Sequence, residues 1–179
     1  AGKPDTLELD HLINYKLKVH TIPPLIKDSI RISPGKHKII KVNAPQGYLL
    51  VKTRKGKSYN DLNFIVRKKA EMNTLNYQKV GRAGKYIIGE YDIEIPTIPP
   101  VFTTSRVLQS STTILQIDEP GKVIISSNTK GFGSIYLLSK NEQKWLYNLD
   151  PSEKKQTLFM QPGIYRIIFR KANTKSSLQ

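Results

Sequence analysis

Apolar and polar residues alternate along short segments of this chain, and prolines and glycines separate the segments. The alternation is clearest in Tyr15–Thr21 and Tyr91–Ile95. It is the period-2 pattern of a strand that buries one face. Turn signals such as Ser33-Pro34-Gly35 and Glu119-Pro120-Gly121 recur roughly every ten residues, as in all-β sandwiches. The pattern therefore predicts an all-β fold.

One stretch fits two structures. In Asp61–Met72, either Asn60 or Asp61 could cap a helix. The residues near helical spacing there are Leu62, Ile65, Val66, Lys69 and Met72. The repeat described next favours a strand, because the matching segment, Gly131–Tyr136, carries two glycines.

The strongest internal signal is a repeat. The segment from Tyr15 to Pro24 recurs from Tyr91 to Pro100, 76 residues later, and both copies end in Thr-Ile-Pro-Pro. Two prolines supply no amide donors, so each strand must end there. A period of 76 exceeds the roughly 20–50 residues of solenoid repeats and suits a small sandwich. We expect two tandem Ig-like, Greek-key β-sandwich modules.

The repeat divides the chain into three parts. Residues 1–21 supply strands, Thr6–Leu12 and Tyr15–Thr21, left from an upstream unit, so we expect a piece of a longer protein. Residues 22–95 form the first module and residues 96–179 the second. Within them, Ile30–Val42 and Arg106–Ile117 each indicate a strand, a tight turn and a strand.

A tyrosine corner is indicated in each module. Met160–Tyr165 has the order apolar residue, Gln, Pro, Gly, Ile, Tyr, in which the Tyr hydroxyl bonds back to the backbone in Greek-key sandwiches. Tyr91, which follows Gly89, is expected to do the same. Both tyrosines are interpreted as structural.

Composition narrows the class of protein. Hydrophobic residues make up 38% of the chain and charged residues 24%, a globular balance. No apolar run approaches the roughly 18 residues of a membrane span. With no cysteine, a disulfide, a thiolate nucleophile or a Cys-based metal site is excluded.

The net charge of +15 is concentrated in one region. Basic residues from Lys36 to Lys69 outnumber the single acid, Asp61, and such a field attracts anionic partners. A solvated surface that keeps the protein soluble is the plainer interpretation. If the surface binds a protein, a glycan or an anionic surface, the candidate residues are Lys36, Lys38, Lys52, Arg54, Lys55, Lys57, Arg67 and Lys68.

No pattern indicates catalysis. The histidines His11, His20 and His37 lack ligand spacing, and neither a nucleophile elbow nor a phosphate-binding loop occurs. Asp92 and Glu94 lie on the polar face of a strand, where cross-strand charge pairing is expected. We expect no enzyme, no metal site, no cofactor and no specific nucleic-acid partner.

Trp145 and Tyr147 offer an alternative. They are expected on one face of a short strand, with Tyr136 on the neighbouring strand. A Trp usually anchors the core of a small sandwich, but an exposed pair could bind sugars.

Several segments together resemble a known family. They are Ile65–Lys68, Lys85–Glu94, Gly131–Tyr136, Leu146–Leu149 and Gln161–Arg166. In order and spacing they resemble the C-terminal region of exported bacterial proteins that begin with a von Willebrand factor type A domain. The resemblance implies an envelope protein, periplasmic or on the cell surface, with an upstream metal-binding domain. That domain's Asp-x-Ser-x-Ser motif is missing here, since Asp28-Ser29 is followed by Ile30.

The sequence thus predicts non-catalytic structural and interaction modules of an exported envelope protein, contacting an acidic partner through a basic face. The alternative is a carbohydrate-binding module that uses an aromatic platform.

Overall fold

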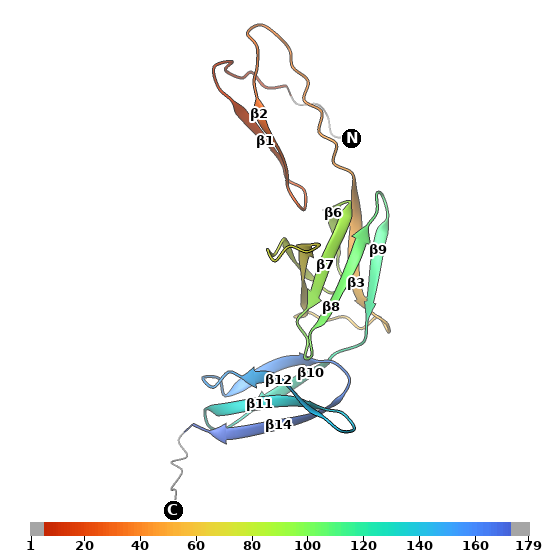
Figure 1. The fold of residues 1–179 in the computed structure, drawn as a ribbon, viewed down its shortest axis with the longest axis vertical. Coiled ribbons are helices and arrows are strands. Elements are labelled where there is room, and N and C mark those ends of the chain that lie inside the picture. The colour runs from red at the N-terminus through yellow and green to blue at the C-terminus, as the bar shows by residue number, and fades with distance from the viewer. Residues whose placement is uncertain (1–5, 173–179) are drawn as a thin grey trace, which may run out of the picture.

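The chain is all-β. The structure, a computed structural model, describes residues 6–172 and contains no helix in that range. No described segment is therefore a helix long and apolar enough to cross a membrane. Figure 1 shows a two-stranded hairpin at one end, a packed pair of sheets in the middle and a second group of sheets at the other end. Residues 1–5 and 173–179 of the expected first and last parts lie outside the described residues.

Fourteen strands are described, and the longest connection between them, residues 31–45, separates β2 from β3. They are β1 (Tyr15–Val19), β2 (Leu25–Ile30), β3 (Gln46–Thr53), β4 (Asn63–Lys68), β5 (Asn76–Lys79), β6 (Ala83–Ile87), β7 (Gly89–Ile95), β8 (Val101–Val107), β9 (Thr112–Ile117), β10 (Gly121–Ser126), β11 (Gly131–Leu138), β12 (Gln143–Leu149), β13 (Lys155–Met160) and β14 (Ile164–Lys171).

The first sandwich packs a three-stranded sheet, β6-β3-β9, against a four-stranded sheet, β5-β4-β7-β8. Alternate residues of each strand point inward, so Leu49 and Val51 of β3 and Ile93 and Ile95 of β7 are at most 1% exposed. Within the three-stranded sheet, β9 runs parallel to β3, while β6 is antiparallel to it.

The first core extends past the module boundary expected at residue 96. Strand β8 pairs with β7 and β9 pairs with β3, and Val107 and Ile117 from these strands lie in the same core. The physical reason is that β3 and β7 would each expose an unpaired edge without them.

The C-terminal sheets are smaller. A two-stranded sheet, β10-β13, faces a three-stranded sheet, β12-β11-β14. Their buried core consists of Ile98, Ile135, Leu149 and Met160. Ile98 comes from the turn between β7 and β8, so the first sandwich contributes a residue to the second core.

The two copies of the repeated sequence have matching hairpins. Leu17 pairs with Lys27 and Val19 with Leu25 in β1–β2, while Ile93 pairs with Thr103 and Ile95 with Val101 in β7–β8. The registers are thus the same over Leu17–Val19 after a shift of 76 residues, whereas β1–β2 has a bulge between Tyr15 and Leu17 that β7–β8 lacks.

The turns of the two hairpins also match. The Thr21 hydroxyl donates to the Pro23 carbonyl at 2.7 Å, and the Thr97 hydroxyl donates to the Pro99 carbonyl at the same distance. A Thr hydroxyl that bonds the backbone two residues on is a common way to stabilise a turn.

Both tyrosine corners are confirmed. The Tyr91 hydroxyl donates to the Ile87 carbonyl at 2.7 Å, and the Tyr165 hydroxyl donates to the Gln161 carbonyl at 2.7 Å. In each case the acceptor lies four residues before the tyrosine.

Three local predictions can be compared with the structure. The ambiguous 61–72 stretch contains strand β4 and no helix. Residues 6–12 form no strand, and neither do residues 36–42, although both were predicted as strands. A strand needs a partner for its backbone groups, and among the described residues neither segment has one.

Candidate functional site

A concavity of the first sandwich lies on the outer face of its four-stranded sheet. It has a volume of about 640 Å³ and is lined by β4, β7, β8 and the loop that follows β4. That loop leaves the sheet at Ala70, whose φ is 62°. It carries Met72, which is 89% exposed, to one rim of the groove, and Phe102, 68% exposed, forms another part of the lining.

Carboxylates from β7 lie in and beside the groove: Asp92 and Glu94 line it, and Glu90 lines a neighbouring hollow. Glu90, Asp92 and Glu94 are alternate residues, so all three point outward. Glu94 accepts from the Arg67 guanidinium at 2.7 Å, and this pair is largely shielded, with side chains 20% and 23% exposed. The expected cross-strand charge pairing is confirmed.

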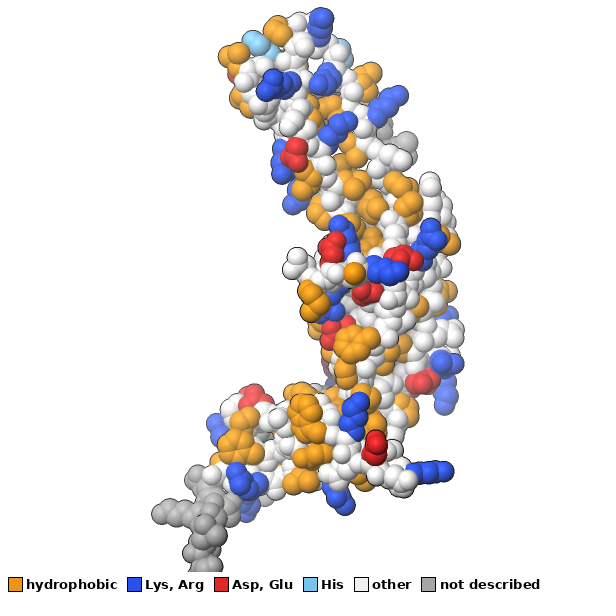
Figure 2. Space-filling model, in the orientation of Figure 1, with side chains coloured by type: hydrophobic (Ala, Val, Ile, Leu, Met, Phe, Trp, Pro, Cys, Tyr) orange, Lys and Arg blue, Asp and Glu red, His pale blue; other side chains and the backbone are white. Residues whose placement is uncertain are grey.

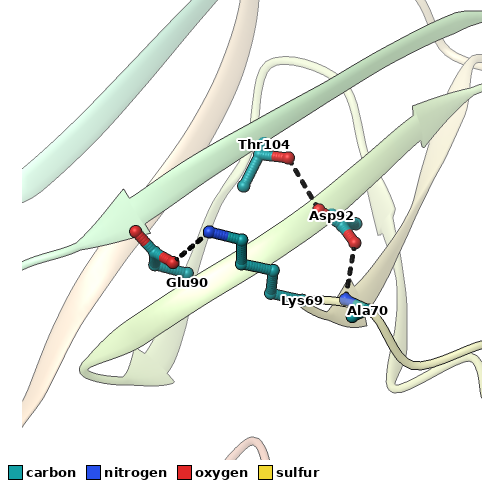
Figure 3. Close-up of polar contacts among 5 residues, drawn as sticks. All are labelled: Lys69, Ala70, Glu90, Asp92 and Thr104. Carbon is teal, nitrogen blue, oxygen red and sulfur yellow. Dashed lines mark hydrogen bonds and ion pairs between the residues drawn. The ribbon is translucent and has the colours of Figure 1, made fainter.

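Figure 3 shows the other two carboxylates. Glu90 accepts from the Lys69 ammonium at 2.6 Å. Asp92 accepts from the Thr104 hydroxyl at 2.7 Å and from the Ala70 amide at 2.9 Å. Asp92 therefore anchors the start of the overhanging loop to the sheet.

These contacts shift the pKa values of the groove. The Lys69 hydrogen bond and charge lower the pKa of Glu90, and Glu90 in turn raises the pKa of Lys69. Hydrogen bonds from Thr104 and the Ala70 amide lower the pKa of Asp92. All three groups are thus held in their charged forms at neutral pH.

The groove is suited to binding rather than to acid–base chemistry. A general acid at neutral pH needs a raised carboxyl pKa, whereas Glu90 and Asp92 are shifted in the opposite direction. No group of His, Cys, Asp and Glu residues within the described range could hold a metal ion. Paired charges beside exposed Met72 and Phe102 give a surface of mixed polarity, and Figure 2 shows acidic and basic side chains next to one another on this part of the molecule.

The structure does not bring the predicted basic residues onto one face. Lys52 is on β3 and Arg67 on β4, which belong to opposite sheets of the sandwich, and both side chains point outward. Lys36 and Lys38 lie before β3, outside both sheets. Lys38 donates to the Arg31 carbonyl at 2.7 Å.

Several of these cations already have partners. Arg54 pairs with Asp118 at 2.8 Å, Arg67 with Glu94 and Lys68 with Glu71 at 3.6 Å. The Lys57 ammonium lies 5.4 Å from the centre of the Tyr59 ring, and the Lys55 backbone amide donates to Glu119. Of the predicted basic residues, Lys52, Arg54, Lys55 and Lys57 are close in sequence, at the end of β3 and in the loop that follows it.

Trp145 and Tyr147 point to different faces of their sheet. A bulge places Trp145 opposite Tyr136 and Tyr147 opposite Ile135. Because Ile135 and Tyr136 are consecutive strand residues, their side chains point to opposite sides. The predicted shared platform therefore does not form.

Trp145 is not the core anchor that the sequence favoured. It is 53% exposed, and its indole Nε1 donates to the Asn148 side-chain oxygen at 2.9 Å. Ile135, fully buried, occupies the centre of that core.

Comparisons of the chain with protein-family models, with curated proteins and with solved structures find no match in any of the three.

The groove escaped prediction from the sequence. Its carboxylates were identified as a pairing face, but Met72 and Phe102 read as ordinary apolar residues. Only the positive φ of Ala70 and the overhang after β4 make them neighbours of that face, and neither feature has a signature in a single sequence.

Proposed function

We propose that this chain is a non-catalytic spacer and interaction segment of an exported envelope protein, built from tandem Ig-like sandwich units with a repeat of 76 residues. The matching hairpins and tyrosine corners support the tandem arrangement. The envelope location and an upstream von Willebrand factor type A domain rest on the sequence motifs alone.

The observation that carries the spacer role is the joint between the first sandwich and the C-terminal sheets. Ile98 is 7% exposed in the second core. Its amide donates to the Phe159 carbonyl and its carbonyl accepts from the Gln161 amide, both at 2.8 Å. The Tyr165 hydroxyl, which donates to the Gln161 carbonyl, also lies 3.1 Å from the Ile98 carbonyl oxygen and can share its proton with it. A turn held in this way fixes one unit against the next, as a stalk requires.

Ile22 is the counterpart of Ile98 at the other end of the first sandwich. It packs against the first core, and its carbonyl accepts from the Ile87 amide at 2.7 Å. The same turn sequence thus makes contact with the following sheets twice, which supports a repeated stacking geometry.

Distance measurements between spin labels test the stalk. Because the chain has no cysteine, Lys85→Cys and Lys144→Cys supply unique labels on exposed positions on either side of the joint. We expect one narrow distance distribution, which broadens in Ile98→Ala. Ile114→Ala, at a 48% exposed position of β9, is the matched control. A broad distribution in the unmutated chain would exclude a stalk.

We further propose that the segment Lys52–Lys57 contacts an acidic partner. Its test is binding to heparin and to anionic vesicles at rising ionic strength. Salt screens the attraction between exposed charges, and the Debye length is only about 10 Å at 0.1 M salt. We expect weaker binding in the double variant Lys55→Glu, Lys57→Glu than in the double variant Lys36→Glu, Lys38→Glu. Both change the net charge by the same amount. Equal losses would mean that only net charge matters.

A second candidate function is carbohydrate binding, favoured by the exposed and hydrogen-bonded Trp145. An exposed indole held in one orientation is a suitable stacking surface for a sugar ring. Glycan binding that is lost in Trp145→Ala but kept in Tyr147→Ala would support it, because the two side chains lie on opposite faces. No binding to a broad glycan array would exclude it.

A further inference from the structure

Within residues 6–172, the C-terminal sheets have no counterparts of the two strands that complete the first sandwich. There, β8 covers one edge of β7 and β9 covers one edge of β3. With the corner residues Tyr91 and Tyr165 aligned, β14 corresponds to β7 and β10 to β3. Among the described residues, β14 pairs only with β11 and β10 only with β13.

The missing strands leave apolar residues in water. Ile93 and Ile95 are 1% and 0% exposed, whereas their counterparts, Ile167 and Phe169, are 44% and 40% exposed. Ile164 and Ile168 on the other face of β14 are 70% and 49% exposed. Figure 2 shows hydrophobic side chains in a band across the C-terminal sheets. Exposed apolar surface of this kind marks an interaction site.

The N-terminal part of the chain contains the counterparts of β8 and β9. The repeat makes β2 equivalent to β8 and residues 37–42 equivalent to β9. Residues 37–42 form no strand here. Strand β2 pairs only with β1, in a sheet of two strands, and an isolated hairpin of this size is at best marginally stable in water.

We propose that residues 25–42 of a second copy complete the C-terminal sheets of the first, so that copies join head to tail. The inference rests on the tandem units of the proposed function. Strand β2 of the second copy leaves β1 and pairs with β14, and residues 37–42 pair in parallel with β10. Because the donor and acceptor surfaces lie at opposite ends of the chain (Figure 1), the contact is heterologous and continues from copy to copy.

The register taken from β7–β8 brings complementary residues together on β14. Arg166 comes to lie opposite Asp28, which at present pairs with Lys16 at 3.1 Å. Ile168 comes to lie opposite Ile26, which now faces Lys18. Strand β14 thus keeps the ion pair of β2 and replaces a lysine opposite Ile26 with an isoleucine.

The register taken from β3–β9 likewise brings apolar residues of the two copies together on β10. Ile124, 56% exposed, comes to lie opposite Ile39, 80% exposed, and Ile125 opposite Ile40. Cross-strand apolar pairs of this kind stabilise a sheet.

Gly121 supplies an independent observation. Its counterpart Gly47 lies under the turn between β8 and β9, where an added Cβ would be 2.0 Å from the Leu108 carbonyl oxygen. A Cβ on Gly121 would meet only the Met160 carbonyl oxygen, at 3.9 Å. Nothing in the isolated C-terminal sheets requires a glycine at position 121. In the completed sheets the backbone of Ile32 of the second copy would lie where Leu108 lies against Gly47, so a side chain at position 121 would clash with it.

Sedimentation velocity of the full chain tests the assembly. We expect species larger than a monomer that grow with protein concentration, with assembly weakened at least about tenfold in Gly121→Val, a factor that corresponds to about 1.4 kcal/mol. Val is a good strand residue, and unchanged circular dichroism would show that this variant folds. The matched control is Thr112→Val, at an exposed position of β9, a strand that takes no part in the proposed contact.

A disulfide lock tests the strand exchange itself. Lys16→Cys with Asp28→Cys joins β1 to β2 across facing positions, so that the oxidised protein is expected to be monomeric and the reduced protein to assemble. An unmutated chain that stays monomeric at its highest soluble concentration overturns the proposal, and so does a locked chain that assembles as well as the reduced one. Neither result affects the stalk, which the spin-label distances test in the monomer.

Discussion

Gly47 provides the sharpest test of the first sandwich. In Gly47→Ala the new Cβ would be 2.0 Å from the Leu108 carbonyl oxygen, and 3.0 Å from both the Ser111 carbonyl oxygen and a Val107 methyl group. Backbone must move to relieve the first contact, because a carbonyl cannot rotate away as the end of a long side chain can. Overpacking of this kind costs about 1–3 kcal/mol.

The movement also threatens two hydrogen bonds that hold the β8–β9 turn on β3. The Tyr48 amide donates to the Ser111 carbonyl at 2.8 Å, and the Ser110 amide donates to the Gln46 carbonyl at 2.9 Å. Each contributes about 0.5–1.5 kcal/mol, so the total expected loss is about 2–6 kcal/mol. Gly121→Ala, at the equivalent open position, is expected to change stability by less than about 0.5 kcal/mol.

Urea unfolding provides the assay, with two signals. Circular dichroism follows all strands, and the fluorescence anisotropy of Trp145, the single tryptophan, falls when the C-terminal sheets that hold its indole unfold. In Gly47→Ala the circular dichroism transition should move to lower urea by more than the fluorescence transition. Equal losses in Gly47→Ala and Gly121→Ala, or no loss in the former, would refute the reasoning.

Three further predictions follow from individual groups. Burial raises the pKa of Tyr91 to about 12, so its neutral form is favoured in the folded state. The free energy of unfolding should therefore fall as the pH rises from 10 to 12, and it should fall less in Tyr91→Phe. Urea unfolding across that pH range measures both. Hydrogen bonds from Thr104 and the Ala70 amide lower the pKa of Asp92 below the usual aspartate value of about 3.9. The stability that Asp92 contributes is therefore present above that usual value and is lost as the pH falls through the folded pKa. An acid titration followed by circular dichroism should show a smaller loss for Asp92→Asn than for the unmutated chain. Trp145 should emit like a solvated indole and be quenched readily by acrylamide, and a buried-type emission maximum would contradict its position on the outer face.

The sequence pattern predicted the strands where alternation and turn residues agreed. Tyr91 and Tyr165 are examples, because a tyrosine corner is a local motif with a fixed hydrogen-bond partner nearby. The stretch around Ile65 was decided by comparison with its repeat rather than by its own spacing. Local agreement of this kind makes an element predictable from one sequence.

The features that escaped prediction depend on contacts between distant residues. Gln78 is 8% exposed and donates to the Leu49 and Arg82 carbonyls, at 3.1 and 2.6 Å, and Tyr86 donates to its side-chain oxygen. Gly84 leaves room for it, since a Cβ there would be 2.2 Å from that oxygen. A buried polar group must be satisfied, but nothing near Gln78 in the sequence identifies its partners.

The predicted basic face also failed to form because it depended on contacts between distant residues. A run of lysines and arginines indicated one charged face, yet Arg67 and Lys52 belong to sheets that face away from each other. The charge of a segment is a local property, whereas the face on which each charge lies depends on which sheet the strand joins.

Edge strands provide the physical reason to expect the C-terminal sheets to be covered. Strand β8, an edge of the four-stranded sheet, carries Thr103, Thr104 and Ser105 in its middle, in keeping with the polar edges of soluble sheets. Strand β14 is eight residues long, with exposed isoleucines on both faces, a pattern typical of a strand inside a sheet. Its sequence is therefore suited to a neighbour on its second edge, and β2 has the residues to fill that place.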